Sequence, residues 1–332
     1  MDMIFFLTFT IVILAVAFDF INGFHDTANA IATSVSSKAL RPRQAIILAS
    51  VMNFVGAMTF TGVAKTITKD IVDPFTMDNG NVVIIAALLA AIAWNLITWY
   101  YGIPSSSSHA LIGSIAGAAI AAAGFQALNY SGFLNIIKAL IFSPVIAFVV
   151  GYIVYSIFKV VFKNSNLSKT NKRFRRIQML TAAFQAYSHG TNDAQKAMGI
   201  ITMALIVNEY QSTNEIQTWV QFICALAMAL GTAAGGWKII KTVGGKIMKI
   251  RPVNGVAADL TGAGVILGAT VLHMPVSTTH VISSSILGVG ASHRIKGVKW
   301  GTAKNMLLTW ISTLPASALL AGIFYFILNL FL

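Results

Sequence analysis

Long runs of hydrophobic residues alternate with short polar segments along the whole chain. Ten runs stand out, and they cover residues 3–37, 44–64, 81–101, 104–125, 133–162, 177–207, 217–237, 253–272, 274–292 and 302–331. A helix needs about 20 mostly apolar residues to cross the hydrocarbon core of a bilayer. The pattern therefore predicts an all-α protein that crosses a membrane many times. Several runs exceed one span, which indicates tilted or broken helices, and runs 104–125 and 274–292 either span or re-enter.

Composition and charge support this class. Only 10% of the 332 residues are charged and 56% are hydrophobic, whereas soluble chains are about 25% charged. The net charge of +13 comes from basic residues in the polar segments, which is the bias of cytoplasmic loops. We therefore expect a multi-pass protein of the cytoplasmic membrane, surrounded by lipid, without a nucleic-acid partner. No basic residue precedes the first run, so we expect a retained membrane segment rather than a cleaved signal peptide.

Two short motifs occur twice in the chain. Residues 23–30 read GFHDTANA and residues 190–197 read GTNDAQKA, which share their glycine, aspartate and final alanine. Residues 104–109 read PSSSSH and residues 275–280 read PVSTTH, which share their proline and histidine and most of the hydroxyl residues between them. Because nearly the same spacing separates both pairs of copies, the motifs indicate an internal duplication.

Loop charges predict that the two halves have opposite orientations. The loop after the first motif is basic, the loop after its copy is acidic, and the bias also reverses in two further pairs of equivalent loops. Because basic loops stay in the cytoplasm, equivalent loops should lie on opposite faces of the membrane. The sequence therefore predicts two inverted-topology repeats of about five helical segments, residues 1–162 and 177–332, joined by a basic cytoplasmic linker at residues 163–176. Both termini are then outside, and such repeats are typical of secondary transporters with broken helices at the midplane.

Four acidic residues lie in or at the edge of hydrophobic runs, namely Asp19, Asp26, Asp193 and Asp259. A charge at the bilayer centre costs at least about 2.5 kcal/mol, so such residues are functional candidates. Asp26 and Asp193 occupy equivalent positions of the duplicated motif, and we predict that they bind a coupling cation. The alternative is hydrogen bonding between packed helices. Asp19 and Asp259 lack a counterpart in the other half, and both interpretations stay open for them.

Each motif aspartate has a polar neighbour on its own helix face. Asn29 follows Asp26 by three residues, and Lys196 follows Asp193 by three residues. Side chains at this spacing are neighbours on a helix. Lys196 is expected to supply positive charge for an anionic substrate or for Asp193. His25 is adjacent to Asp26, and because histidine is the side chain whose charge most readily changes in the physiological pH range, this pair suggests proton coupling.

Glycines and prolines indicate where the helices should change. Gly23 and Gly190 each precede a motif aspartate by three residues, and we expect a helix break there that frees carbonyl oxygens for a cation. Pro104 and Pro275 are expected in the first turn of a helix, where the missing N–H is no loss.

Rows of hydroxyl side chains follow both prolines. A helix N-terminus carries about half a positive charge and binds anions readily. Two such helix starts that meet from opposite sides would form a cradle for a small oxyanion. The candidate substrate-binding residues are therefore Ser105, Ser106, Ser107, Ser108, Ser277, Thr278 and Thr279, together with Lys196. The alternative is that these small residues only let helices pack closely.

The histidines that end both hydroxyl rows, His109 and His280, are expected to have structural roles more than to line the site. The adjacent Ser108 and His109 also raise the alternative of a membrane enzyme with a serine nucleophile. Neighbouring residues on a helix point apart, whereas a catalytic triad needs convergent geometry. We therefore expect a protein that is not an enzyme.

These motifs resemble those of the inorganic phosphate transporter (PiT) family. The family signature places a glycine, then an Asn-Asp or His-Asp pair, then an Asn or Lys before alanine, once in each half. Here it reads GFHDTANAIAT from Gly23 and GTNDAQKAMGI from Gly190. The hydroxyl motifs are also similar to the family's, and the resemblance extends from about residue 15 to 310. His25 and Lys196 are typical of the bacterial low-affinity phosphate carriers, whereas eukaryotic relatives usually have asparagine at both positions.

The resemblance implies a homodimer with ten to twelve helical elements around the duplicated motifs. It implies that the serine and threonine turns bind inorganic phosphate. It also implies that Asp26, Asn29, Asn192 and Asp193 help to bind the coupling cation, and we add the neighbouring Asn22 and His25 to this set. The cation is sodium in some relatives and the proton in others, and the latter accept phosphate complexed with a divalent metal such as Mg²⁺. No tightly bound cofactor is expected.

Two alternatives share the predicted architecture. Some members of the family resemble sulfate carriers, but phosphate at neutral pH keeps a P–OH donor that a carboxylate such as Asp193 accepts. A passive anion channel would not need buried titratable residues within inverted repeats. Cation-coupled phosphate symport therefore remains the leading hypothesis.

Overall fold

The computed structural model describes residues 3–72 and 79–331, and α-helices dominate it. The first half contains α1 (Met3–Ser36), α2 (Pro42–Ala57), α3 (Gly62–Asp70), α4 (Gly80–Tyr101), α5 (Ser107–Ala123) and α6 (Tyr130–Val161). The second half contains α7 (Leu167–Asp193), α8 (Gln195–Val207), α9 (Thr218–Ala234), α10 (Trp237–Lys246), α11 (Pro252–Val271), α12 (Thr278–Arg294) and α13 (Trp300–Leu328). Two short 3₁₀ turns, η2 (Phe125–Ala127) and η3 (Ile295–Gly297), follow α5 and α12.

The helices confirm the prediction of a polytopic all-α membrane protein. Within the described residues, α1, α4, α6, α11 and α13 are long and apolar enough to cross a membrane. The pair α2 and α3 is bent by 67°, the pair α9 and α10 is bent by 71°, and each pair is apolar enough to count as one broken span. By contrast, α5 and α12 contain 17 residues each, which is less than the roughly 20 that a full span requires.

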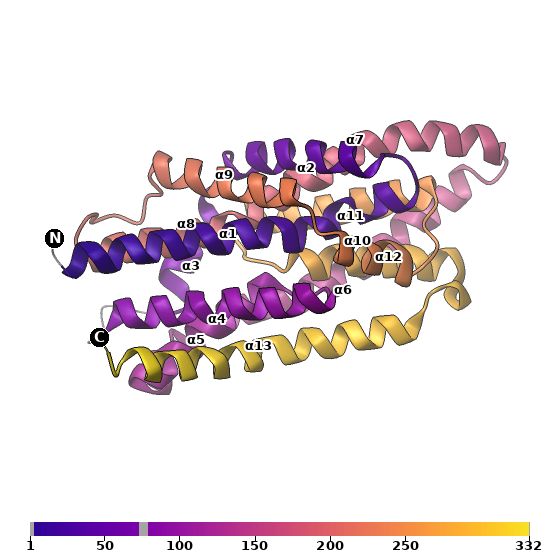
Figure 1. Cartoon of the computed structure of the whole chain (residues 1–332). Helices are drawn as coiled ribbons and strands as arrows, with labels where there is room; N and C mark the ends of the chain where they lie inside the picture. The colour runs from indigo at the N-terminus through magenta and orange to yellow at the C-terminus, as the bar shows by residue number, and fades with distance from the viewer. Residues whose placement is uncertain (1–2, 73–78, 332) are drawn as a thin grey trace.

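The two halves are related by inversion. In Figure 1, α1 begins at the end of the molecule where both termini lie, whereas its counterpart α7 begins at the opposite end. Packing repeats in the same way: α1 packs on α9 as α7 packs on α2, and α5 packs on α13 as α12 packs on α6. Helices of one half therefore bury their apolar faces largely against helices of the other half. Most of residues 163–176 form the first turns of α7, because that helix begins at Leu167.

The helix breaks predicted at the motif glycines are wrong. Helix α1 runs without interruption through Gly23, and the break in the second half comes at Ala194, after Gly190. A Cβ atom on Gly23 would lie 2.4 Å from the carbonyl oxygen of Met228 in α9. A Cβ atom on Gly190 would lie 2.3 Å from the carbonyl oxygen of Asn53 in α2. Both glycines therefore serve the close approach of two helices, as small residues commonly do in membranes.

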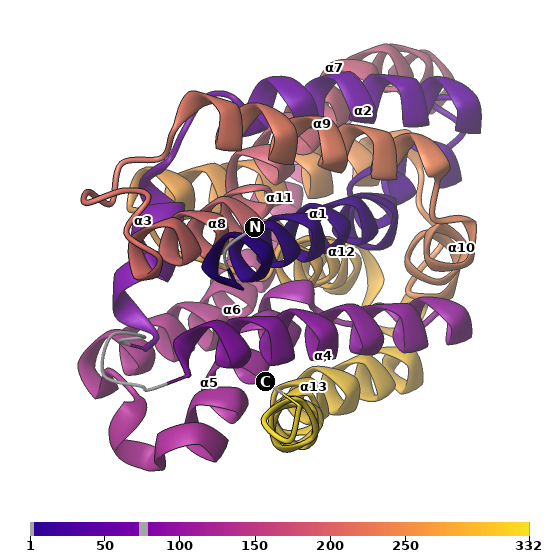
Figure 2. The ribbon, with the colours of Figure 1, turned by 60° about the vertical axis from the view of Figure 1, so that its left-hand side comes forward.

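The duplicated motifs lie at the centre of the bundle. In Figures 1 and 2, α1 and α12 lie between α2 and α9 on one side and α4 and α13 on the other. Helix α1 contacts α4, α7, α8, α9 and α12. Helices α5 and α12 begin inside the protein, since the residues of their first turns are buried. This arrangement brings both hydroxyl rows to the level of the motif aspartates.

Candidate functional site

The two motif aspartates lie in equivalent environments. Asp26 and Asp193 are buried, with at most 1% of their surface exposed. The hydroxyl of Ser107, at the start of α5, donates to Asp26 Oδ2 at 2.5 Å. In the other half, the Thr278 hydroxyl at the start of α12 donates to Asp193 Oδ2 at 2.9 Å. Each carboxylate therefore accepts a hydrogen bond from the hydroxyl row of its own repeat.

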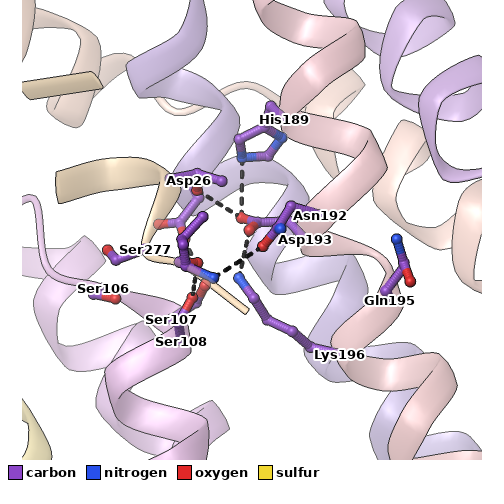
Figure 3. A network of polar contacts seen from close by, with 12 residues as sticks. Asp26, Ser106, Ser107, Ser108, His189, Asn192, Asp193, Gln195, Lys196 and Ser277 are labelled. Carbon is purple, nitrogen blue, oxygen red and sulfur yellow. Dashed lines mark hydrogen bonds and ion pairs between the residues drawn. The ribbon is translucent and has the colours of Figure 1, made fainter. Parts of the chain in front are cut away.

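Nitrogen side chains occupy the other positions around both carboxylates. His25 Nδ1 lies 2.6 Å from Asp26 Oδ1, and its Nε2 lies 3.0 Å from the Thr98 hydroxyl. In the second half, the ammonium group of the buried Lys196 donates to Asp193 Oδ1. His189 Nε2 lies 3.1 Å from Asp193 Oδ2. Figure 3 shows Asp193 between His189 and Lys196.

Contacts between the halves join the two helix starts. The Asn29 amide donates to the Thr279 hydroxyl at 2.8 Å, although the two residues belong to different repeats. The Ser108 hydroxyl donates to the carbonyl oxygen of Val276 at 2.9 Å. The first turns of α5 and α12 therefore meet at the centre of the bundle, where Ser107, Ser108 and the aspartates lie together (Figure 3). The meeting of these two helix starts brings together the hydrogen-bond donors that an oxyanion site needs.

The hydroxyl rows divide into two groups. Ser106 and Ser277 are N-cap residues, whose hydroxyls accept from the backbone N–H groups of His109 at 3.1 Å and His280 at 3.2 Å. Ser105 donates to the Thr98 hydroxyl at 2.8 Å. The side chains that contact the central cluster are therefore those of the two following residues in each row, Ser107 and Ser108 in α5 and Thr278 and Thr279 in α12.

The predicted position of the prolines is wrong. Helices α5 and α12 begin three residues after Pro104 and Pro275, not at them. A serine hydroxyl can accept a hydrogen bond from a free backbone N–H group at a helix start, so Ser106 and Ser277 determine where the two helices begin. The prolines lie in the extended segments that lead to these caps.

The other predicted cation ligands differ in their contacts. Asn192 donates to the Thr270 hydroxyl at 3.0 Å and to the Met274 carbonyl at 3.2 Å. Its Oδ1 accepts from the backbone N–H of Val276 at 3.3 Å, so it holds the segment that leads to α12. Asn22 is buried, and neither its Oδ1 nor its Nδ2 has a hydrogen-bond partner among the described residues.

An incompletely satisfied polar layer surrounds Asn22. Both carboxylate oxygens of the buried Asp19 and both amide atoms of the buried Asn95 also lack hydrogen-bond partners within the described part of the chain. The His25–Thr98 contact sets the register of α1 against α4, and both helices run in the same direction (Figure 1). Asn22 and Asn95, each three residues earlier, therefore lie at the same level. Asp19 lies beside the Asn22 side chain and within electrostatic range of Asp193 and Lys196.

The second acid without a counterpart is well satisfied. Asp259 is buried, and its carboxylate accepts from the Thr33 hydroxyl at 2.5 Å and the Thr181 hydroxyl at 3.1 Å. Three helices, α1, α7 and α11, provide these groups. This is the pattern expected of interhelical hydrogen bonding, in contrast to the unsatisfied Asp19.

The paired histidines line an apolar cavity and, within the described residues, make no hydrogen bond or ion pair with the motif aspartates. The rings of His109 and His280 are 4.4 Å apart, and His280 stacks on Trp310 at 4.0 Å between ring centroids. These rings line an apolar cavity of about 690 Å³ together with Pro144 of α6 and Pro315 of α13. The arrangement fits the structural role expected for both histidines.

Sequence reasoning did not identify two members of the cluster. His189 precedes Asp193 by four residues, a spacing that places both on one helix face and was available in the sequence. Thr98 contacts His25 and Ser105 from α4, and no motif marks it. Its role depends on a long-range helix contact.

Comparison with known proteins identifies the family. The model of the phosphate transporter family matches twice, at residues 22–169 and 162–321. The "Probable low-affinity inorganic phosphate transporter" of Bacillus subtilis is 78% identical over 99% of both chains, and a protein of the same name from Rhizobium meliloti is 42% identical over 96% of both. A solved structure titled "The sodium-dependent phosphate transporter" superimposes with a TM-score of 0.89 at 26% identity, covering 98% of this chain and all of that one. These relatives are transporters and not enzymes, and the chain belongs to the phosphate transporter family.

Proposed function

We propose that this protein carries inorganic phosphate across the cytoplasmic membrane by symport with protons. The observation that carries the proposal is the repeated contact of a buried carboxylate with a hydroxyl at a helix start, Asp26 with Ser107 and Asp193 with Thr278. Each pair combines a group that takes up a cation with a group that donates to an anion.

The phosphate would bind between the first turns of α5 and α12. Ser107, Ser108, Thr278 and Thr279 provide hydroxyls from both halves, and the backbone N–H groups of two helix starts add positive potential. Lys196 adds a full positive charge on the Asp193 side. The site is buried, which makes each interaction with the anion stronger than it would be in water.

Coupling follows from competition for the same hydroxyls. While Asp26 is ionised, it accepts the hydrogen bond of Ser107 and repels an incoming anion. A proton on the carboxyl group weakens this bond and removes the charge, so the hydroxyl is free to donate to phosphate. Because proton and phosphate each favour binding of the other, this is a thermodynamic linkage between the two sites.

The nitrogen neighbours favour the proton over sodium. Sodium prefers oxygen ligands, but His25 and Lys196 direct nitrogen atoms at the two carboxylates. The lysine already compensates Asp193, which leaves Asp26, beside His25, as the carboxylate that would accept the coupling proton. Sodium coupling remains the second candidate because the solved relative is titled sodium-dependent.

We extend the proposal to orientation and assembly. Both termini lie at one end of the molecule (Figure 1), and the basic segment that begins α7 lies at the other. The positive-inside bias supports a cytoplasmic location for the basic end and an outer location for the termini. The family resemblance supports a homodimer.

The test is phosphate uptake into proteoliposomes under separately imposed gradients. We expect accumulation with an inward proton gradient alone, and none with an inward sodium gradient alone. Parallel runs with and without Mg²⁺ test whether a metal–phosphate complex is the substrate. Asp26→Asn should abolish accumulation, whereas the matched control Asp70→Asn, outside the cluster, should not.

Two results would contradict this proposal. Accumulation that follows only the sodium gradient would replace the proton with sodium as the coupling ion. Equal uptake by wild type and Asp26→Asn under a proton gradient would remove Asp26 from the coupling mechanism.

A further inference from the structure

A second polar pocket lies far from the central cluster, at the end of the molecule opposite the termini. It has a volume of about 170 Å³ and lies between the end of α6, the connection to α7, the start of α11 and the end of α12. The lining residues used below are Tyr155, Phe158, Lys159, Arg251, Asn254 and His293. The pocket contains neither motif aspartate, so the inference does not depend on proton coupling.

The charges in this pocket have one sign. Lys159, Arg251 and His293 come from three different helices or their caps, and none of the lining residues is acidic. Burial and the nearby Arg251, Lys159 and Arg294 lower the pKa of His293, so the positive charges that line the pocket are those of Lys159 and Arg251. Such a concentration of cations without a carboxylate attracts an anion to the pocket.

The start of α11 adds uncharged donors. Arg251 is the N-cap of this helix, and its backbone N–H is satisfied by Asn254 Oδ1 at 3.2 Å. The Asn254 side chain is only 2% exposed and lies close to the Tyr155 hydroxyl, but its Nδ2 makes no hydrogen bond within the described residues. Val253 and Asn254 also lie in the first turn of α11, where backbone N–H groups lack an intrahelical partner. A helix N-terminus of this kind favours an oxyanion.

Hydrogen bonds between α6 and α12 hold the donors in place. The Tyr155 hydroxyl lies 2.8 Å from His293 Nδ1, and Lys159 Nζ donates to the carbonyl oxygen of Ser292 at 2.7 Å. An ammonium group has three donors, so Lys159 retains two for a ligand. The ring of Phe158 forms an apolar wall beside these groups.

We infer that this pocket is a second anion site, which binds a tetrahedral phosphoryl group at the basic face of the protein. Lys159, Arg251 and the Asn254 amide would contact the phosphoryl oxygens. The group is either the headgroup phosphate of an anionic phospholipid or free inorganic phosphate. In both cases the ligand would bridge the end of α6 and the start of α11.

The test compares three purified variants with the wild type. Arg251→Gln and Lys159→Gln each remove one charge from the pocket, and Lys163→Gln is the matched control because this exposed lysine lies nearby but outside the lining. One arm measures binding of inorganic phosphate in neutral detergent by calorimetric titration. The other arm uses native mass spectrometry to count phosphatidylglycerol molecules retained from nanodiscs that also contain phosphatidylcholine.

The two arms distinguish the sources of the ligand. If free phosphate is bound, the phosphate affinity of one class of binding sites should fall about tenfold or more in Arg251→Gln and Lys159→Gln, because each variant loses a charged hydrogen bond. If a lipid is bound, both variants should lose one retained phosphatidylglycerol and keep wild-type phosphate binding. The inference is overturned if both variants match Lys163→Gln in both arms.

Discussion

Replacing Lys196 with methionine would remove the cation that pairs with Asp193 in a fully buried position. The ammonium group contacts Asp193 Oδ1, and the remaining partners are Thr278 at 2.9 Å and His189 at 3.1 Å. Removing one member of a buried ion pair costs about 3–5 kcal/mol, because the other charge is left uncompensated. Since the Thr278 hydroxyl still donates to Asp193 and the His189 ring stays beside it, we expect Lys196→Met to lie near the lower limit, about 3 kcal/mol.

The reverse substitution should cost more. In Asp193→Asn, the buried ammonium of Lys196 loses the carboxylate that accepts its hydrogen bond, and we expect a loss near the upper limit, about 5 kcal/mol. The double variant Asp193→Asn/Lys196→Met contains neither charge. Because neutral replacements of a buried pair are often tolerated, it should be more stable than either single variant. It should nevertheless fail to accumulate phosphate, which separates the stabilising role from the transport role.

The assay is the free energy of unfolding in mixed detergent micelles, measured for the complete double-mutant cycle, with proteoliposome uptake on the same preparations. Lys65→Met is the matched control, since Lys65 pairs with Glu215 at 2.6 Å at the surface. An exposed pair of this kind contributes about 0–1 kcal/mol. If Lys196→Met costs no more than Lys65→Met, or if the single effects add in the double variant, Asp193 and Lys196 do not form a desolvated pair and the reasoning fails.

Three further predictions address other parts of the molecule. Ser107→Ala should abolish phosphate accumulation while the chain still folds, as judged by its elution from size exclusion; wild-type uptake would contradict the hydroxyl's role in coupling. Gly23→Ala should lower the unfolding free energy by about 1–3 kcal/mol through overpacking against α9; Gly264→Ala, where a Cβ meets no atom within 4 Å, is the control and should be neutral or stabilising in the same measurement. Asp19→Asn removes a carboxylate without hydrogen-bond partners in the described structure, so stability should not fall; if Asp19 holds a cation during transport, the cation concentration for half-maximal uptake should rise, and an unchanged value would exclude that role.

The sequence by itself determined the class of protein and the residues that matter most. Hydrophobic runs and the scarcity of charge are properties of local composition, so they predicted a polytopic helical protein that the structure confirms. The duplicated motifs identified Asp26 and Asp193 as equivalent, because a repeat is visible without knowing how its copies pack. The reversal of loop charge likewise predicted inversion, since the positive-inside bias acts on each loop separately.

Only the tertiary structure decided which groups meet. Gly23 serves as a contact point for α9 and not as a helix break, because the neighbouring backbone comes from a segment about 200 residues away. Thr98 and Thr279 acquire their roles through contacts from other helices, and the basic pocket gathers residues of α6, α11 and α12. The periodicity of a helix shows which of its faces is apolar or polar, but the partner of that face depends on long-range packing. In this protein the helices of each half pack against helices of the other half, so the sequence of one repeat does not show which groups its side chains contact.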